Sequence, residues 1–303
     1  MIPIVFHPDY EVDIGTHVFP TRKYRLVSER LREERTIARA SIKQPNAVSD
    51  DDVALVHTAE YIEKIVRGSF SAQEELLLEV PFSPELRDAM WLCAGGTLLT
   101  AVLALERAVA VHLGGGFHHA FPDHGEGFCL INDVAVAIGI LRRDNLVDRV
   151  LVIDLDVHHG NGTAAIFADE EAVFTFSMHQ QQNYPFVKPP SDLDLGLRNG
   201  IDDAAYLGEL DRHLPTIVKQ HRPELAFYLA GADPYQHDQL GGLGLTLDGL
   251  RKRDELVFNY VRAAAIPVAV TLAGGYAANH DDTVEIHCNT VRAAREVYLR
   301  PTE

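Results

Sequence analysis

The sequence predicts a single α/β domain in which helices flank a doubly wound, mainly parallel central sheet. Three observations support this prediction. Short β-branched runs alternate with longer helix-like stretches along the chain. Several of these runs are apolar at consecutive positions, as in strands that helices cover on both faces. No repeat, low-complexity segment or flexible linker divides the 303 residues, so we expect one domain over residues 1–303.

The strongest strand candidates are Ile2–Phe6, Ala108–Leu113, Val150–Leu155, Val173–Ser177, Ala226–Ala230 and Pro267–Leu272. Clusters of turn residues predict loops at the rim of the sheet over Glu79–Ser83 and Gln180–Leu195.

Two helices have clear start signals. Ser83 is a suitable N-cap and Pro84 a suitable first-turn residue, which predicts a helix that runs toward Leu105. Thr246 precedes the stretch Leu250–Ala264, whose apolar residues fall on roughly one helical face.

Composition and charge narrow the function classes. Hydrophobic residues make up 47% of the chain, enough for a sizeable core, and the formal net charge is -17. This charge argues against binding nucleic acid through its phosphates. It could attract a cationic substrate, although solubility alone is the simpler interpretation. Three cysteines, Cys93, Cys129 and Cys288, are too few and too scattered for a disulfide framework or a thiolate zinc site.

No apolar run has the length expected of a membrane span, and the N-terminus lacks the features of a signal peptide. We therefore expect a cytoplasmic protein with no membrane partner. The sequence leaves the oligomeric state open.

Four stretches with chemically active side chains each follow a predicted strand. They are Gly114–His119, Asp154–His158, Ala230–Asp233 and Ala273–Tyr276. In an open parallel sheet, ligands bind outside the carboxyl ends of the strands, so these stretches are expected to converge. Together they offer carboxylates and an imidazole for a divalent metal, a pair of histidines for proton transfer, and a phenol. That set is typical of a metal-assisted hydrolase of an amide or ester.

The metal ligands are expected to be Asp156, His158 and Asp233. Residues i and i+2 of extended backbone point to the same face, so Asp156 and His158 can reach one ion. A hydrogen-bonded pair in a loop is the commoner role of an isolated Asp-x-His, but the nearby glycines favour a metal site here. Two carboxylates and one imidazole suit zinc, and Fe(II) or Co(II) would also fit. Gly160 and Tyr235 stand where the Asp-x-His-x-Asp and Asp-x-Asp patterns of a two-metal hydrolase would have further carboxylates, so we expect one ion.

The proton-transfer groups are expected to be His118 and His119. A surface pair is the usual role of two adjacent histidines, but their position behind three glycines at a strand end favours catalysis. Asp154 lies in an apolar run and needs a partner, either a histidine ring N–H or a bound cation. Tyr276 follows two glycines and is placed to donate its O–H to an oxyanion beside the metal, although most tyrosines serve only in packing.

With Gly125–Cys129, these segments resemble the zinc-dependent histone deacetylases and their bacterial relatives, which share the arginase/deacetylase fold. The resemblance runs from about His7 to beyond Tyr276. Within the family, the chain is most similar to the class IV branch in the segments His7–Tyr10, Gly114–His119, Gly241–Leu243 and Lys252–Phe258.

The resemblance implies a zinc ion held by Asp156, His158 and Asp233. Family members also bind a structural potassium or sodium ion, and the matching residues here are Asp154, Asp156, His158, Ser177 and Met178. A second such ion would lie near the backbone of Phe167, Glu170 and Val173.

The resemblance also implies roles in catalysis and substrate binding. His118 and His119 would transfer protons, and Tyr276 would polarise the scissile carbonyl. A narrow tunnel for the acyl-lysine stem would have walls formed by Gly127, Phe128 and Tyr184.

One position departs from many members of the family. They have Asp where this chain has Asn161, the expected partner of His119, while Asn is typical of the class IV branch. Asn can orient the ring by accepting a hydrogen bond, but it cannot stabilise an imidazolium by charge. The division of acid and base roles between His118 and His119 is therefore left open.

These observations support three hypotheses of function. The leading one is a zinc amidohydrolase that removes an acetyl or longer acyl group from the side-chain amine of lysine in a protein or peptide. The second is a deacetylase of acetylated polyamines or other small amides, which the loops around the tunnel would decide. The third is a binding protein that keeps the fold without turnover, and the intact metal and proton-transfer positions argue against it.

Overall fold

The computed structural model describes residues 2–38 and 41–300. Its strands form one eight-stranded sheet in the order β2-β1-β3-β8-β7-β4-β5-β6, and every pair is parallel. The strands are β1 (Ile4–Val5), β2 (Ile42–Lys43), β3 (Val109–His112), β4 (Val150–Asp154), β5 (Val173–Gln180), β6 (Leu193–Leu197), β7 (Leu225–Leu229) and β8 (Val268–Thr271). The predicted α/β class is confirmed.

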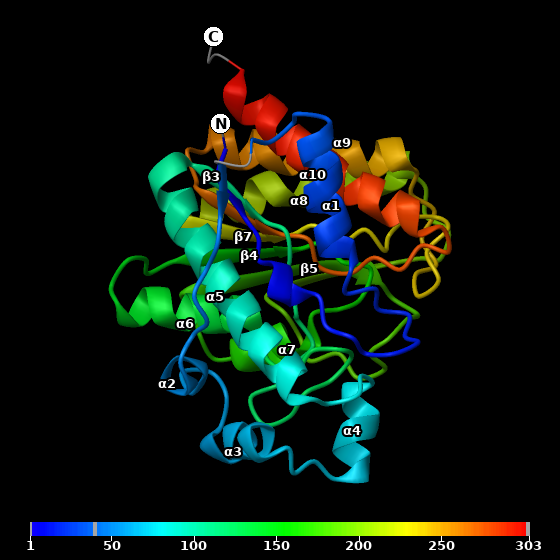
Figure 1. The fold of residues 1–303 in the computed structure, drawn as a ribbon. Helices are drawn as coiled ribbons and strands as arrows, with labels where there is room; N and C mark the ends of the chain where they lie inside the picture. Colours follow the sequence, from blue (N-terminus) through cyan, green and yellow to red (C-terminus); the bar gives the residue numbers. More distant parts are fainter. Residues whose placement is uncertain (1, 39–40, 301–303) are drawn as a thin grey trace.

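Helices cover both faces of this sheet. The described helices are α1 (Lys23–Glu33), α2 (Asp50–Val53), α3 (Ala59–Arg67), α4 (Ala72–Leu78), α5 (Pro84–Arg107), α6 (Asp133–Arg143), α7 (Asn161–Ile166), α8 (Asp203–His221), α9 (Leu247–Ala263) and α10 (His280–Leu299), with a short 3-10 helix at Pro8–Tyr10. Figure 1 shows α1, α8, α9 and α10 on one side of the sheet and α5 and α6 on the other. The central strands β3, β4, β7 and β8 are buried along their whole length because both faces are covered.

Strand order and register determine where the four functional stretches meet. β3, β8, β7 and β4 are consecutive in the sheet, and each is followed by one of those stretches. Asp154 pairs with Leu229, Leu229 pairs with Thr271, and Thr271 pairs with His112, so the four strands end at the same level. All four stretches therefore emerge side by side at one edge.

The two helix starts that the sequence indicates are confirmed. The side chain of Ser83 accepts a hydrogen bond from the Leu86 amide at the start of α5, with Pro84 in the first turn. Thr246 caps α9 in the same way by accepting from the Gly249 amide. Such caps satisfy amides that have no partner within the helix.

The expectation of a loop over Gln180–Leu195 is partly wrong. Strand β5 extends to Gln180, and the edge strand β6 begins at Leu193. β6 has one buried residue, and its remaining positions alternate between half-buried and exposed. Three prolines upstream obscure this weak pattern, since they are typical of loops.

Helix α5 is the described helix that is long and apolar enough to cross a membrane by length and composition. This differs from the expectation that no apolar run has such a length. The core helix of a folded domain passes the same test, and 61% of the apolar window is buried within the protein. It packs on α6, β3 and β8, which accounts for its apolar character.

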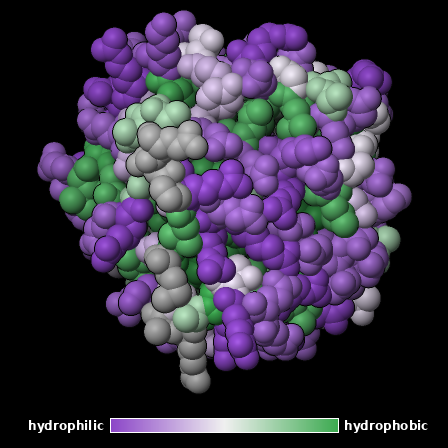
Figure 2. All heavy atoms as spheres, turned by 90° about the horizontal axis from the view of Figure 1, so that it is seen from above, coloured by the Kyte–Doolittle hydropathy of each residue, from purple (hydrophilic) through white to green (hydrophobic). Residues whose placement is uncertain are grey.

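The outer surface over α1, α9 and α10 is largely hydrophilic. Figure 2 shows this face from above, with apolar side chains in small separate groups. Helix α9 buries Leu250, Val257, Phe258 and Val261 toward the sheet while Lys252 is exposed. The core therefore lies between the helices and the sheet, as the amphipathic pattern of this helix indicates.

Candidate active site

The three expected metal ligands lie together beyond the ends of β4 and β7. Nδ1 of His158 is 3.0 Å from Oδ1 of Asp156 and 3.5 Å from Oδ2 of Asp233. The three residues are buried, and one ligand atom of each lies within 4.8 Å of the others. The expectation of extended backbone is wrong, because β4 ends at Asp154 and the turn that follows carries Asp156 and His158. This turn brings the pair together, since the His158 amide donates to Asp156.

The residues fit a divalent cation. Oδ2 of Asp233 is buried and accepts no hydrogen bond from the residues that the structure describes. Oδ2 of Asp156 accepts one from the Gly274 amide at 2.8 Å. A Cβ at Gly274 would lie 1.9 Å from Oδ2 of Asp233, so the close approach of the backbone requires glycine. A buried, unpartnered carboxylate oxygen beside an imidazole and a second carboxylate has the chemistry of a zinc site.

The charges at this cluster also favour a cation. Burial and the neighbouring Asp156 raise the pKa of the Asp233 carboxyl. Burial would also raise the pKa of Asp156, but the nearby His118 and His158 lower it instead. A bound divalent ion would favour the ionised form of both carboxylates, because its positive charge lies close to them.

The two adjacent histidines turn toward one pocket and have different partners. Nδ1 of His118 is 2.7 Å from Oδ2 of Asp154, and Nδ1 of His119 is 2.6 Å from Oδ1 of Asn161. The two Nε2 atoms are 3.2 Å apart. Each Nδ1 therefore donates to an oxygen acceptor, and both Nε2 atoms are directed at the same region of the pocket. Asp154 is thus partnered by a histidine ring N–H.

The partners give the two rings opposite charge preferences. Burial would lower the pKa of His118, but the carboxylates of Asp154 and Asp156 outweigh it and raise that pKa to about 9. Burial lowers the pKa of His119 well below its usual range, and the neighbouring His118 and His158 lower it further. The surroundings therefore favour the protonated form of His118 and the neutral form of His119.

Glu126 joins the site, although sequence reasoning did not single it out. Oε1 of Glu126 accepts from Nδ2 of Asn161 at 2.8 Å and from the hydroxyl of Tyr184 at 2.7 Å. Its position inside the segment Gly125–Cys129, which carries part of the family resemblance, could have identified it as a candidate. Because this carboxylate holds the Asn161 amide, the side-chain oxygen of Asn161 is directed at His119.

Asp238 is a second residue that the sequence did not reveal. Its Oδ2 accepts from the backbone amide of Tyr276 at 2.6 Å, and its Oδ1 accepts from the amides of Leu240 and Gly241. The side chain therefore fixes the loop that places the Tyr276 ring. Burial raises the pKa of the Tyr276 phenol well above its usual range, as do Asp156 and Asp233. Tyr276 consequently stays protonated and can donate its O–H.

A narrow aromatic pocket leads to the metal ligands. Phe19 and Phe128 stack with their ring centroids 6.1 Å apart and their planes at 2°, and the Tyr276 ring meets Phe128 edge-on at 5.8 Å. Gly127 also lines the cavity, whose volume is about 20 Å³. Phe19 was not expected, because it lies in a loop without hydrophobic periodicity. Tyr184 packs beside this cavity, with its ring centroid 5.1 Å from that of His119.

The residues expected to hold monovalent cations are partly brought together. Ser177 pairs with Asp154 across β4 and β5, and Met178 follows it as a buried residue. Oδ1 of Asp154 accepts from the Asp156 amide at 3.2 Å. Phe167, Glu170 and Val173 form one turn, in which amides donate to the Phe167 and Glu170 carbonyls.

Known proteins share this sequence and this fold. A family profile described as "Histone deacetylase domain" matches residues 17–291. The chain is 43% identical over 297 residues to an uncharacterized protein of Picosynechococcus sp., covering 98% of this chain and 99% of that protein. It is 30% identical over 288 residues to Histone deacetylase 2 of Arabidopsis thaliana, covering 91% of this chain and 74% of the relative.

Further comparisons agree with this result. A probable deacetylase of Methanothermobacter thermautotrophicus is 30% identical over 250 residues and covers 77% of this chain and 73% of its own length. A crystal structure of an HDAC homolog complexed with SAHA superimposes with a TM-score of 0.79 at 24% identity, covering 98% of this chain and 88% of that one. That similarity shows the fold, which is the arginase/deacetylase fold. From the profile match and these relatives, the chain belongs to the histone deacetylase family and is a hydrolase that acts on acetylated amides.

Proposed function

We propose that this protein removes an acetyl group from the side-chain amine of lysine in a protein or peptide, with zinc held by Asp156, His158 and Asp233. The observation that carries the proposal is the position of this cluster at the base of the pocket between Phe19 and Phe128. A flat, narrow aromatic channel suits an unbranched alkyl stem, which can bury its methylenes between the rings while the acylated nitrogen at its end reaches the metal ligands.

When bound, zinc would act as a Lewis acid on the acyl carbonyl. The Tyr276 hydroxyl would donate a hydrogen bond to the same carbonyl oxygen as negative charge develops on it. Its raised pKa keeps the proton available for this bond. Asp238 contributes indirectly, because it holds the backbone amide of Tyr276.

His119 would be the base. Its neutral form is favoured at neutral pH, and its Nε2 faces the pocket. It would take a proton from the attacking water as oxygen bonds to the carbonyl carbon, and then give it to the amine nitrogen as the C–N bond breaks. His118 keeps its proton because of Asp154, so it would stabilise developing negative charge rather than accept a proton.

The size of the cavity favours a short acyl group. The whole pocket, from the rings of Phe19 and Phe128 to Asp156 and His158, has a volume of about 20 Å³, so its walls must adjust even for an acetyl group and must adjust more for each added methylene. A long acyl chain would require the walls of the pocket to separate. We therefore propose acetyl as the preferred acyl group.

A hydrolysis panel tests this function. Purified protein loaded with zinc is given lysine peptides with acetyl, butyryl, octanoyl and myristoyl groups, and acetylated spermidine and putrescine. We expect the highest kcat/KM for the acetyl peptide. A faster reaction with the acetylated polyamines would replace the lysine proposal with the small-amide one. A maximum at the myristoyl peptide would contradict the proposed acyl group.

The panel needs a control for contaminating hydrolases. His119→Gln removes the proposed base, and His213→Gln changes a partly exposed histidine on α8 by the same substitution. We expect hydrolysis to be lost in the first variant and retained in the second. Equal loss in both would show that the measured activity does not come from this pocket.

A further inference from the structure

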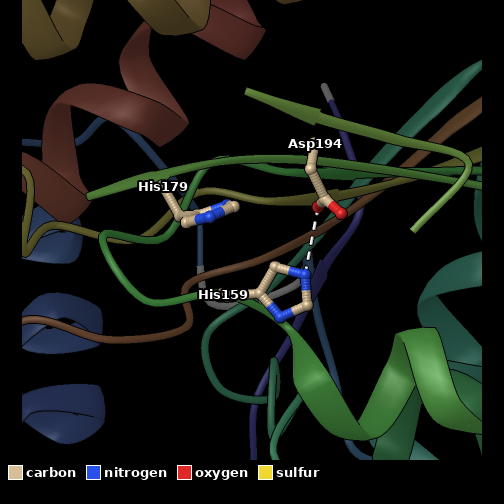
Figure 3. A group of neighbouring side chains, drawn as sticks. All are labelled: His159, His179 and Asp194. Atoms are coloured by element: carbon tan, nitrogen blue, oxygen red, sulfur yellow. Dashed lines mark hydrogen bonds and ion pairs between the residues drawn. The ribbon is translucent and has the colours of Figure 1, made fainter. Parts of the chain in front are cut away.

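A second group of metal-ligating side chains lies outside the pocket. It consists of His159, His179 and Asp194, and Figure 3 shows the three side chains directed toward one another. A ring nitrogen of each histidine and a carboxylate oxygen of Asp194 lie within 4.8 Å of one another. Nε2 of His159 is 3.0 Å from Oδ1 of Asp194, and the two imidazole centroids are 4.7 Å apart.

The chain brings these three residues together from different elements. His159 follows His158 directly, but its ring is bonded to Asp194 whereas that of His158 is bonded to Asp156. His179 lies near the end of β5 and Asp194 near the start of the neighbouring strand β6. The group is therefore separate from the Asp156, His158 and Asp233 cluster, with which it shares no side chain.

We propose that His159, His179 and Asp194 bind a second divalent transition-metal ion, for which zinc is the reference case. Two imidazoles and one carboxylate are a ligand set that zinc, nickel and cobalt all accept, with further positions open to water. This proposal does not depend on the reaction that the pocket catalyses.

The burial and hydrogen bonds of these three side chains resemble those of metal ligands in known sites. His159 and His179 are buried, while the Asp194 side chain is 31% exposed, which leaves a path for an ion from solvent. Nδ1 of His179 is 3.0 Å from Oγ of Ser177, so Nε2 is left to face an ion. Oδ2 of Asp194 accepts from the Ser191 amide at 2.9 Å, so the oxygen that faces an ion is Oδ1, which contacts Nε2 of His159. Such contacts to the far atoms orient metal ligands in known sites.

The distances require only a small adjustment. With bonds of about 2.0–2.1 Å to a tetrahedral zinc ion, ligand atoms stand roughly 3.3 Å apart. His159 and Asp194 already approach this separation at 3.0 Å. A ring nitrogen of His179 lies within 4.8 Å of the ligand atoms of His159 and Asp194, so the side chain has to bring it closer by at most roughly 1.5 Å.

A second ion would act on the loop of residues 181–192. His179 and Asp194 stand at the two ends of this loop. An ion bound to all three side chains would therefore link both ends of the loop to His159, which directly follows His158. The loop carries Tyr184, whose ring centroid lies 6.2 Å from that of His158. We therefore expect ion binding to slow amide hydrogen exchange in residues 181–192.

Metal stoichiometry tests the proposal. Metal-stripped full-length protein is dialysed against a series of free Zn²⁺ concentrations, and bound zinc per chain is measured by elemental analysis. We expect His179→Gln to bind one equivalent fewer than the parent, and Asp194→Asn to do the same. His213→Gln should bind as many equivalents as the parent, because this histidine lies on α8 outside the group. Equal stoichiometry in the parent and in both cluster variants would overturn the proposal.

Two further measurements complete the test. Circular dichroism shows whether each variant folds. If His179→Gln fails to fold, the zinc content of Asp194→Asn provides the test, because the partly exposed Asp194 can be replaced without disturbing the core. Asp233→Asn should also lose one equivalent, by removing a ligand of the other cluster. The experiment therefore counts the ions at the two sites independently of hydrolysis. If the parent binds a single equivalent of zinc, and only Asp233→Asn loses it, the second site is excluded.

Discussion

The side-chain oxygen of Asn161 lies 2.6 Å from Nδ1 of His119, while Asp154 makes the corresponding contact to His118 at 2.7 Å. One histidine is thus held by an amide and its neighbour by a carboxylate. The difference determines which ring carries a proton at neutral pH, since only the carboxylate stabilises an imidazolium by charge.

The first prediction concerns this asymmetry. Asn161→Asp should raise the pKa of His119 and move the corresponding limb of the profile of kcat/KM against pH to higher pH. Glu126 now accepts from the Asn161 amide, so repulsion between two carboxylates will accompany the change. Asn145→Asp, at an exposed position, is the control. Superimposable profiles for Asn161→Asp and the parent would mean that this contact does not govern His119.

The second prediction concerns Tyr276. Tyr276→Phe should lower kcat by roughly 10²–10³, the usual effect of removing one hydrogen-bond donor to an oxyanion. Zinc content and thermal stability should be nearly unchanged, because the hydroxyl makes no hydrogen bond to the described residues. Tyr260→Phe removes a hydroxyl that donates to Asp211 on the outer surface and should leave kcat at the parental value. A Tyr276→Phe protein as fast as the parent would leave this side chain a packing role.

The third prediction concerns the metal ligands. Asp156→Ala, His158→Ala or Asp233→Ala should abolish activity and remove the zinc of the active-site cluster, since three ligands leave none redundant. Chelation of the parent should abolish activity, and added zinc should restore it. Asp248→Ala, in the first turn of α9, is the control. Full turnover by Asp233→Ala at parental zinc content would rule out the assignment.

The fourth prediction concerns stability in acid. Nδ1 of His57 is bonded to the Phe121 carbonyl, and its Nε2 accepts from the Asn132 amide, so the ring must be neutral. Burial lowers the pKa of His57 from 6.5 to about 4. Between these two values the unfolded chain binds the extra proton, so the free energy of unfolding falls as pH decreases from 6.5 toward 4.

At pH 5 this residue should account for about 2 kcal/mol of lost stability relative to pH 7. His57→Gln keeps a donor and an acceptor but does not titrate. Urea unfolding at both pH values should show a loss smaller by about that amount in the variant than in the parent. Identical losses would show that His57 is not held neutral in the folded protein.

The central strands could be predicted because burial on both faces produces continuous apolar runs. Val150–Asp154 and Leu225–Leu229 are examples. The edge strands β2 and β6 could not, because their two and five residues are mostly half-buried or exposed and form no such run. Likewise, the expected metal ligands and the histidine pair belong to short motifs that directly follow predicted strands, so they could be identified as candidates from the sequence.

The supporting residues of the site could not be predicted in the same way. Glu126 reaches Asn161 across 35 residues of sequence, and Asp238 reaches Tyr276 across 38. Such contacts form when separate loops fold over the sheet edge, and they leave no periodic pattern in the chain. Phe19 was missed for the same reason, since its stacking on Phe128 depends on where a long N-terminal loop lies.

The order of the strands has a consequence for the nascent chain. β3 and β4 are made early, but β7 and β8 stand between them in the finished sheet. During synthesis, a chain that has not yet reached Leu225 cannot hold the loop after β3 and the loop after β4 at their final separation. Both histidines of the dyad and Asp154 are then present without a rigid frame between them. Metal uptake and hydrolytic competence therefore arise late in folding, after the C-terminal third of the chain has entered the centre of the sheet, as is typical of folds rich in long-range strand pairing.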